Sequence, residues 1–178
     1  DRARQHIREA AQDEATNLLK LRVVKGLKDD LRSAPRLEAI RLALSVDQDQ
    51  ALDLLRTHFE DLTGRGHAPR LWALLAQVSA AKFDRWRFKL ALNLGGGEAM
   101  KWALSRPEPD NVIDRVSWIS IQYIGGRAQV ALESASALTT EITPAMPPEV
   151  GLLCLITRYR ALMQLGLTED ACAVLRSI

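Results

Sequence analysis

Apolar residues recur at every third or fourth position along most of this chain, in segments that glycine and proline separate. The clearest stretch contains Ala51, Leu52, Leu55, Phe59 and Leu62. This spacing places all five side chains on one face of an α-helix. Strand patterns are scarce, because only residues 116–123 are rich in β-branched and aromatic side chains. We therefore expect an all-α fold, with helices at about 1–32 (one long helix or two short ones), 36–45, 48–62, 69–81, 83–94, 98–104, 111–124, 127–139, 149–165 and 168–177.

Several residues predict where these helices begin and end. Asp47 and Asp110 are expected to be N-cap residues, because a carboxylate accepts hydrogen bonds from the free backbone N–H groups of a first helical turn. Pro35 is expected to end the first helical region, since the residue before a proline is disfavoured in the helical conformation. Residues 63–66, which contain two glycines, are expected to end another helix in a turn, because glycine tolerates the left-handed conformation that ends helices.

The composition is that of a folded chain without a strong electrostatic preference. Of the 178 residues, 47% are hydrophobic and 26% are charged, and the formal net charge is +2. One domain over residues 1–178 is expected, since this length suits a single core. A charge near zero removes the strongest global argument for binding nucleic acid or an anionic membrane. No segment approaches the roughly 18 uninterrupted apolar residues of a membrane span.

The N-terminus and the cysteines bear on cellular context. The first residues contain neither an initiator methionine nor an apolar signal segment. We therefore expect a domain of a longer protein, and the alternative is a trimmed or processed chain from which a targeting segment has been removed. Cys154 and Cys172 lie within apolar runs, which predicts two buried free thiols in a reducing, cytoplasmic compartment. A disulfide between them stays open as an alternative if their helices pack side by side.

Glycine-containing turns indicate that the helices are paired. Three segments, Leu92–Met100, Gln122–Ala131 and Met163–Ala171, join the end of one helix to the start of the next through glycine. A small residue on the inward face of the second helix allows two antiparallel helices to approach closely. Stacked helix pairs of this size are typical of solenoids. An irregular helical bundle whose loops use glycine is the alternative.

The segment Tyr159–Leu175 resembles the second half of a tetratricopeptide repeat. Gly166 matches the turn glycine of that family, Ala171 the small residue five positions later, and Leu175 the bulky apolar residue that follows. The same glycine-to-alanine spacing occurs once more, at positions 126 and 131. The resemblance therefore covers mainly the C-terminal half of the chain.

Two residues depart from the tetratricopeptide pattern. Arg158 and Tyr159 stand where that family prefers a large apolar residue and a small one. The resemblance implies a short right-handed solenoid of antiparallel helix pairs. It also implies a scaffold that binds a peptide or partner protein on its concave face, and it implies no catalysis.

The residue types that carry catalysis or bind metals do not fall into an arrangement with known chemistry. His6, His58 and His67 lie too far apart for a metal motif, and we expect each of them at the surface. No serine-nucleophile elbow, phosphate-binding loop or Cys-x-x-Cys pair occurs. We therefore expect no enzyme activity, no bound metal and no cofactor.

Residues 81–90 concentrate positive charge beside aromatic side chains. On a helix, three basic residues share one stripe, and the neighbouring stripe contains Phe83, Trp86 and Leu90. The aromatic stripe suits a core whose rim the long basic side chains cover. The same pattern also suits an acidic protein partner, or nucleic acid or a membrane surface. The candidate partner-binding residues are Lys82, Arg85, Trp86, Arg87 and Lys89.

The sequence thus predicts a non-catalytic protein-interaction module, which acts as a scaffold or adaptor for a partner protein or peptide. An acidic partner would suit the basic segment. One alternative function is that of a nucleic-acid-binding helical domain that uses residues 82–89, and a second is that of an enzyme whose site residues are dispersed along the chain.

Overall fold

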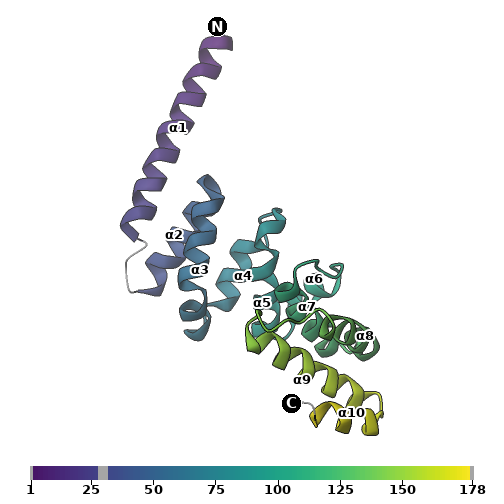
Figure 1. Cartoon of the computed structure of the whole chain (residues 1–178). Helices are drawn as coiled ribbons and strands as arrows, with labels where there is room; N and C mark the ends of the chain where they lie inside the picture. The colour runs from purple at the N-terminus through teal and green to yellow at the C-terminus, as the bar shows by residue number, and fades with distance from the viewer. Residues whose placement is uncertain (1, 28–31, 177–178) are drawn as a thin grey trace. The chain divides into compact units, whose positions relative to one another are not determined.

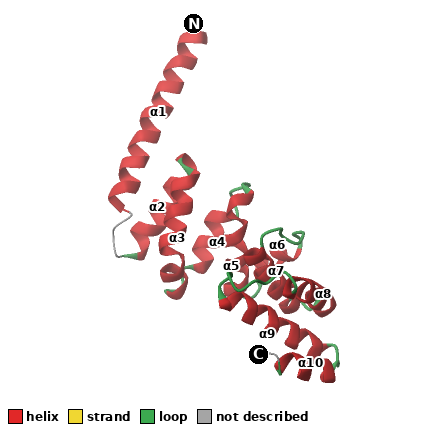
Figure 2. Cartoon of the chain, in the orientation of Figure 1, coloured by secondary structure: helices red, strands yellow, loops and turns green. Residues whose placement is uncertain are grey.

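The computed structural model describes residues 2–27 and 32–176, with the side chains of residues 2–8, 10 and 11 excluded. Within these ranges the chain is helical and has no strand, which confirms the predicted all-α class (Figure 2). The α-helices, labelled in Figure 1, are α1 (Arg2–Leu27), α2 (Ser33–Val46), α3 (Gln48–Gly64), α4 (Ala68–Leu75), α5 (Asp84–Leu94), α6 (Gly97–Leu104), α7 (Val112–Ile124), α8 (Ala128–Thr139), α9 (Pro148–Gln164) and α10 (Thr168–Leu175). A short 3-10 helix, η1 (Ala81–Phe83), directly precedes α5.

The structure confirms one predicted N-cap and corrects the other. The carboxylate of Asp47 accepts hydrogen bonds from the backbone N–H groups two and three residues ahead, at 3.0 and 3.1 Å. At the start of α7 the cap is Asn111 rather than Asp110, and its side-chain oxygen accepts the corresponding bonds at 3.0 and 3.3 Å. Asn111 directly precedes the first helical residue, whereas Asp110 lies one position too far away to reach those donors.

Two further helix boundaries differ from the prediction. Pro35 does not end a helix but lies in the first turn of α2, where the missing N–H of proline removes no helical hydrogen bond. Helix α4 ends at Leu75, before the predicted end at residue 81. The chain turns there, since the N–H of Val78 donates to the carbonyl of Leu75 at 3.2 Å.

The chain, expected as one domain over residues 1–178, divides into two compact units, Asp1–Phe83 and Asp84–Ile178. In the first unit α2 is the central helix, because α1, α3 and α4 all contact it. Its core is apolar and draws on several helices. Buried members of this core are Val24, Leu37, Ile40, Leu55, Phe59, Leu62, Leu71, Leu75 and Phe83.

In the second unit the main contacts join neighbouring helices and next-but-one helices. Helix α7 contacts α5, α6, α8 and α9, and α9 contacts α8 and α10. The core has mostly aliphatic side chains, with a smaller cluster under α10. Its buried members include Trp86, Phe88, Leu90, Trp118, Ile119, Ile121, Leu138, Leu162 and Val174.

Three helix ends share one turn geometry. Gly66, Gly126 and Gly166 have φ angles of 81°, 79° and 76°, in the left-handed region that favours glycine. Each glycine N–H donates to the carbonyl three residues earlier, at 3.0–3.2 Å. The next N–H donates to the carbonyl five residues earlier, at 2.9–3.0 Å. These two bonds define a Schellman motif.

The residue five positions after each of these glycines is fully buried. Ala131 and Ala171 confirm the predicted inward small residues, and Leu71 occupies the equivalent place after Gly66. The sequence places the turn at Gly95 in one group with the turns at Gly126 and Gly166, but its geometry differs from theirs. Its N–H donates to the carbonyl four residues earlier, and a second left-handed glycine at position 97 begins α6.

None of the helices in the described part of the chain is both long and apolar enough to cross a bilayer.

Candidate interaction site

The aromatic stripe of the predicted basic segment is part of the interior. Phe83 and Leu90 are fully buried, and Trp86 is 7% exposed. Phe88 lies on the same helix as Trp86, and the centroid of its ring is 5.3 Å from the ring centroid of Trp102 in α6. These positions confirm the interpretation in which the aromatic residues belong to the core.

Two of the four basic candidates are held by carboxylates within their own unit. In the first unit, Lys82 Nζ lies 2.6 Å from Asp49 Oδ1. In the second unit, the side chain of Arg87 is only 2% exposed and pairs with Asp84, one helical turn earlier. The Arg87 guanidinium also lies over the ring of Trp102, 5.5 Å from its centroid. Arg87 is therefore a buried cation and not a surface contact.

The other two basic candidates flank Trp86. Arg85 is 47% exposed, and its Nε lies 3.9 Å from Asp114 Oδ1. Its guanidinium carbon and Lys89 Nζ lie 5.9 and 5.4 Å from the Trp86 ring centroid. Burial raises the pKa of the Asp114 carboxyl, while Arg85 lowers it. The five candidates thus do not form one free basic surface, since Trp86 and Arg87 are buried.

The histidines and cysteines differ in part from expectation. His58 is buried rather than exposed, because it falls on the same inner stripe of α3 as Leu55 and Leu62. His67 is half-buried. The side chain of His6 lies outside the described residues. Both cysteines are free thiols. Cys154 is buried and Cys172, expected to be buried, is exposed.

No group of three or more His, Cys, Asp or Glu residues that could hold a metal ion occurs among the side chains that the structure describes.

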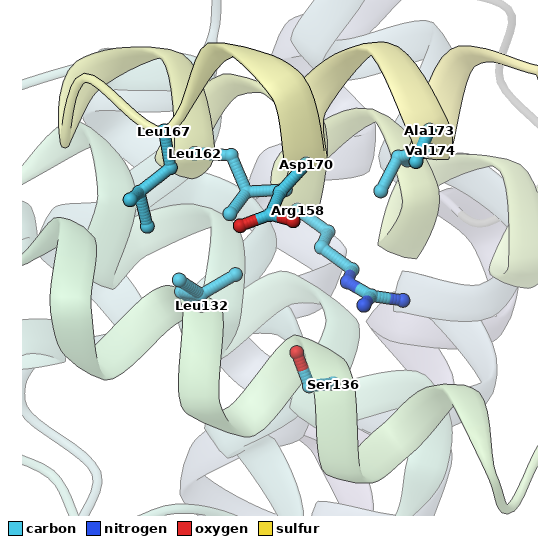
Figure 3. A pocket seen from close by; sticks show the side chains of 8 residues that line it. All are labelled: Leu132, Ser136, Arg158, Leu162, Leu167, Asp170, Ala173 and Val174. Carbon is cyan, nitrogen blue, oxygen red and sulfur yellow. The ribbon is translucent and has the colours of Figure 1, made fainter.

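A groove of about 470 Å³ lies between α8, α9 and α10 of the second unit (Figure 3). Figure 3 shows three leucines near one end, Arg158 and Asp170 in the middle, and Ser136 on the α8 side. The volume is in the range of ligand-binding clefts. The complete lining is Leu132, Ser136, Arg158, Leu162, Leu167, Asp170, Ala173 and Val174.

Arg158 is the distinctive residue of this groove. It is half-buried, and its Nε is buried without a hydrogen-bond partner among the described residues. Asp170 lines the same groove but forms no ion pair with it. The Nε–H group of Arg158 is thus a buried hydrogen-bond donor without an acceptor, which is costly inside a protein.

Other arginines of low exposure have carboxylate partners. Arg36 is 11% exposed and its Nη1 lies 2.7 Å from Asp61 Oδ2. Arg115 is 14% exposed and binds two glutamates, with N–O distances of 2.9 and 2.7 Å. Arg87 pairs with an aspartate. Arg158 departs from this pattern.

A second groove, of about 380 Å³, lies between α2 and α4 of the first unit. Two of its three charged side chains are matched to each other, because Arg41 donates two hydrogen bonds to Glu38, at 2.8 and 2.5 Å; the third, Arg70, is exposed. The rest of its lining is mainly aliphatic. This groove therefore has no unsatisfied charge in the Arg41–Glu38 pair to attract a ligand.

The sequence-based candidates did not include the α8–α10 groove. One signal was present, since Arg158 stands where the tetratricopeptide pattern prefers a large apolar residue. The side chains that surround it come from three helices, and periodicity within a single helix does not bring them together.

The described part of the chain is thus all-α, with a groove between α8, α9 and α10 that contains Arg158 and Asp170. Comparison with models of known protein families, with curated proteins and with solved structures finds no match to this chain.

Proposed function

We propose that this chain is a non-catalytic protein-interaction module, a scaffold built from tetratricopeptide-like helix pairs that binds a partner protein or peptide. Two features of the fold support a solenoid-like arrangement within each unit. The main contacts of the second unit join neighbouring and next-but-one helices. Three helix ends also use the same glycine turn. Helices packed in series offer long surfaces for partners.

The observation that carries the proposal is the apolar surface of the last helix pair. Six large apolar side chains of α9, α10 and their connecting turn are exposed: Leu152, Leu153, Met163, Leu165, Leu167 and Leu175. Leu167 also lines the groove. Large apolar side chains exposed beside polar groups are typical of protein-binding surfaces. Contact with a partner protein would remove these side chains from water.

Affinity capture followed by quantitative mass spectrometry tests this function. The wild-type chain is compared with a double variant, Leu152→Glu with Leu175→Glu. The control is Val130→Glu, which changes an exposed apolar side chain of α8. Circular dichroism of all three chains checks that each remains helical. We expect specific partners that the double variant loses and the control retains. Identical partner sets for the double variant and the wild type would contradict the proposal.

The nucleic-acid alternative is decided by a separate titration. Fluorescence anisotropy with labelled single-stranded DNA at low salt measures binding by the wild type and by Lys82→Glu with Arg85→Glu. Since Lys82 and Arg87 already pair with carboxylates, we expect no salt-sensitive binding. Tight, salt-sensitive binding that the double variant abolishes would favour the nucleic-acid function instead.

A further inference from the structure

We propose that the α8–α10 groove binds an acidic side chain of a partner peptide through an ion pair with Arg158. A neighbouring aliphatic residue of the peptide packs against the three leucines of the groove, Leu132, Leu162 and Leu167. The inference rests on the proposed function and names the chemistry of the partner at one site. It places that partner on a surface different from residues 82–89.

The first argument is the missing partner of Arg158. Arg36, Arg87 and Arg115, all of low exposure, each bind at least one carboxylate. Arg158 is half-buried, and no carboxylate of the described residues pairs with its guanidinium. Its Nε is covered by protein, so a ligand carboxylate would bind to the Nη nitrogens. Partial desolvation makes a carboxylate from a ligand more valuable to this guanidinium than to one in free solvent. The planar guanidinium also suits two-point binding of a carboxylate.

The second argument is the composition of the groove around Arg158. Leu132, Leu162 and Leu167 form an apolar wall at one end (Figure 3). An aliphatic side chain next to the acidic one in sequence could pack there. The groove therefore combines an apolar wall with two charged side chains, Arg158 and Asp170, and ligand sites commonly pair an apolar lining with a few polar groups.

The third argument concerns Asp170, whose negative charge makes the groove less favourable for a ligand with two negative charges than for a carboxylate with one. Asp170 is exposed and lines the groove with Arg158. Its negative charge opposes a phosphate with two charges more strongly than a carboxylate with one. The same carboxylate can accept a hydrogen bond from a backbone N–H of the peptide. The groove thus favours an acidic peptide over a phosphorylated one or a nucleic acid backbone.

Fluorescence anisotropy with a short synthetic peptide tests the inference on the full chain. The probe has Leu-Glu-Leu at its centre, a fluorophore at its N-terminus and an amidated C-terminus, and its control has Gln in place of Glu. We expect the Glu probe to bind and the Gln probe to bind at least roughly tenfold more weakly, the usual effect of losing a charged hydrogen bond. No binding of the Glu probe, or equal binding of both probes, would overturn the inference.

Variants of the chain then locate the contact. Arg158→Ala is expected to weaken binding of the Glu probe at least roughly tenfold. The matched control Arg160→Ala removes an exposed arginine of the same helix outside the groove and should leave affinity within about twofold. Asp170→Asn should leave binding equal or tighter, because it removes a competing carboxylate. A loss with Asp170→Asn as large as with Arg158→Ala would overturn the assignment of the anchor.

Two further measurements separate the possible reasons for failure. A free-acid peptide with Gln at its centre distinguishes a terminal carboxylate from a side-chain carboxylate, and preferential binding of that peptide would contradict the proposal. Arg158→Ala is also included in the affinity capture. If it retains the partners that Leu152→Glu with Leu175→Glu loses, the interaction function stands and the role of Arg158 is wrong.

Discussion

Arg87 and Arg85 provide a matched test of the buried ion pair in α5. The two arginines are separated by one residue, but the first is 2% exposed and the second 47%. Arg87→Ala removes the ion pair with Asp84 and the contact with the ring of Trp102. Arg85→Ala removes only a partly exposed ion pair of 3.9 Å and a guanidinium contact with Trp86, 5.9 Å from the ring centroid.

The expected effects on the free energy of unfolding differ several-fold. A hydrogen bond to a charged group contributes about 1.5–3 kcal/mol, and a desolvated cation–π contact contributes about 1–2 kcal/mol. Asp84 is 27% exposed and regains some water once its partner is gone, which reduces the sum. We expect Arg87→Ala to destabilise the chain by about 2–4 kcal/mol, and Arg85→Ala by less than about 1 kcal/mol.

Urea unfolding followed by circular dichroism and tryptophan fluorescence measures both effects. Three of the four tryptophans, at positions 86, 102 and 118, belong to the second unit, so fluorescence reports mainly on that unit. Linear extrapolation converts the midpoint shifts into free energies when the slope is unchanged. Arg87→Met serves as the control that keeps the apolar stem and removes the charge.

Equal destabilisation by Arg87→Ala and Arg85→Ala would refute the reasoning. It would mean that the Arg87 guanidinium is solvated, as a surface row of basic residues requires.

Three further outcomes follow from particular contacts. Asn111→Ala should cost about 1 kcal/mol of unfolding free energy in urea, and Asp110→Ala close to none, because only Asn111 caps α7; similar costs would return the cap to Asp110. Gly126→Ala should destabilise the chain, and Gly125→Ala should do so less, because the end of the flexible Leu104 side chain can shift away from the added methyl group. A Cβ at position 125 would lie 2.5 Å from Leu104 Cδ2, whereas position 126 has free space but a φ of +79° that costs about 1–2 kcal/mol. In a double-mutant cycle, Leu104→Ala should therefore couple to Gly125→Ala and not to Gly126→Ala. In thiol titration with Ellman's reagent at pH 8, exposed Cys172 should react at once. Cys154 should react only on unfolding, because burial raises the pKa of its thiol; two fast thiols would contradict this.

The helical class and many helix ends could be predicted from sequence because they depend on neighbours in the chain. The spacing of Leu55, Phe59 and Leu62 defines a buried face that the structure confirms. The Asp47 cap and the turn glycines also act over a few residues. Single-position errors arise where two adjacent residues suit the same role, as at Asp110 and Asn111.

The environment of the charged residues could not be predicted in the same way. On a helical wheel Arg87 lies beside the aromatic stripe, and its burial depends on Trp102 in another helix. The groove at Arg158 needs side chains from α8, α9 and α10. Sequence spacing relates residues within one helix, whereas both of these sites result from packing between helices.

The shared geometry of the three glycine turns has a consequence for how such a chain can change its length. Gly66 and Gly126 are 60 positions apart, and Gly126 and Gly166 are 40 apart. Each reversal is nevertheless set by about six residues, through the same two hydrogen bonds. Insertion of whole helical turns away from these residues would lengthen a helix without changing how the chain reverses. A fixed repeat period is therefore unnecessary for chain reversals that share one local geometry.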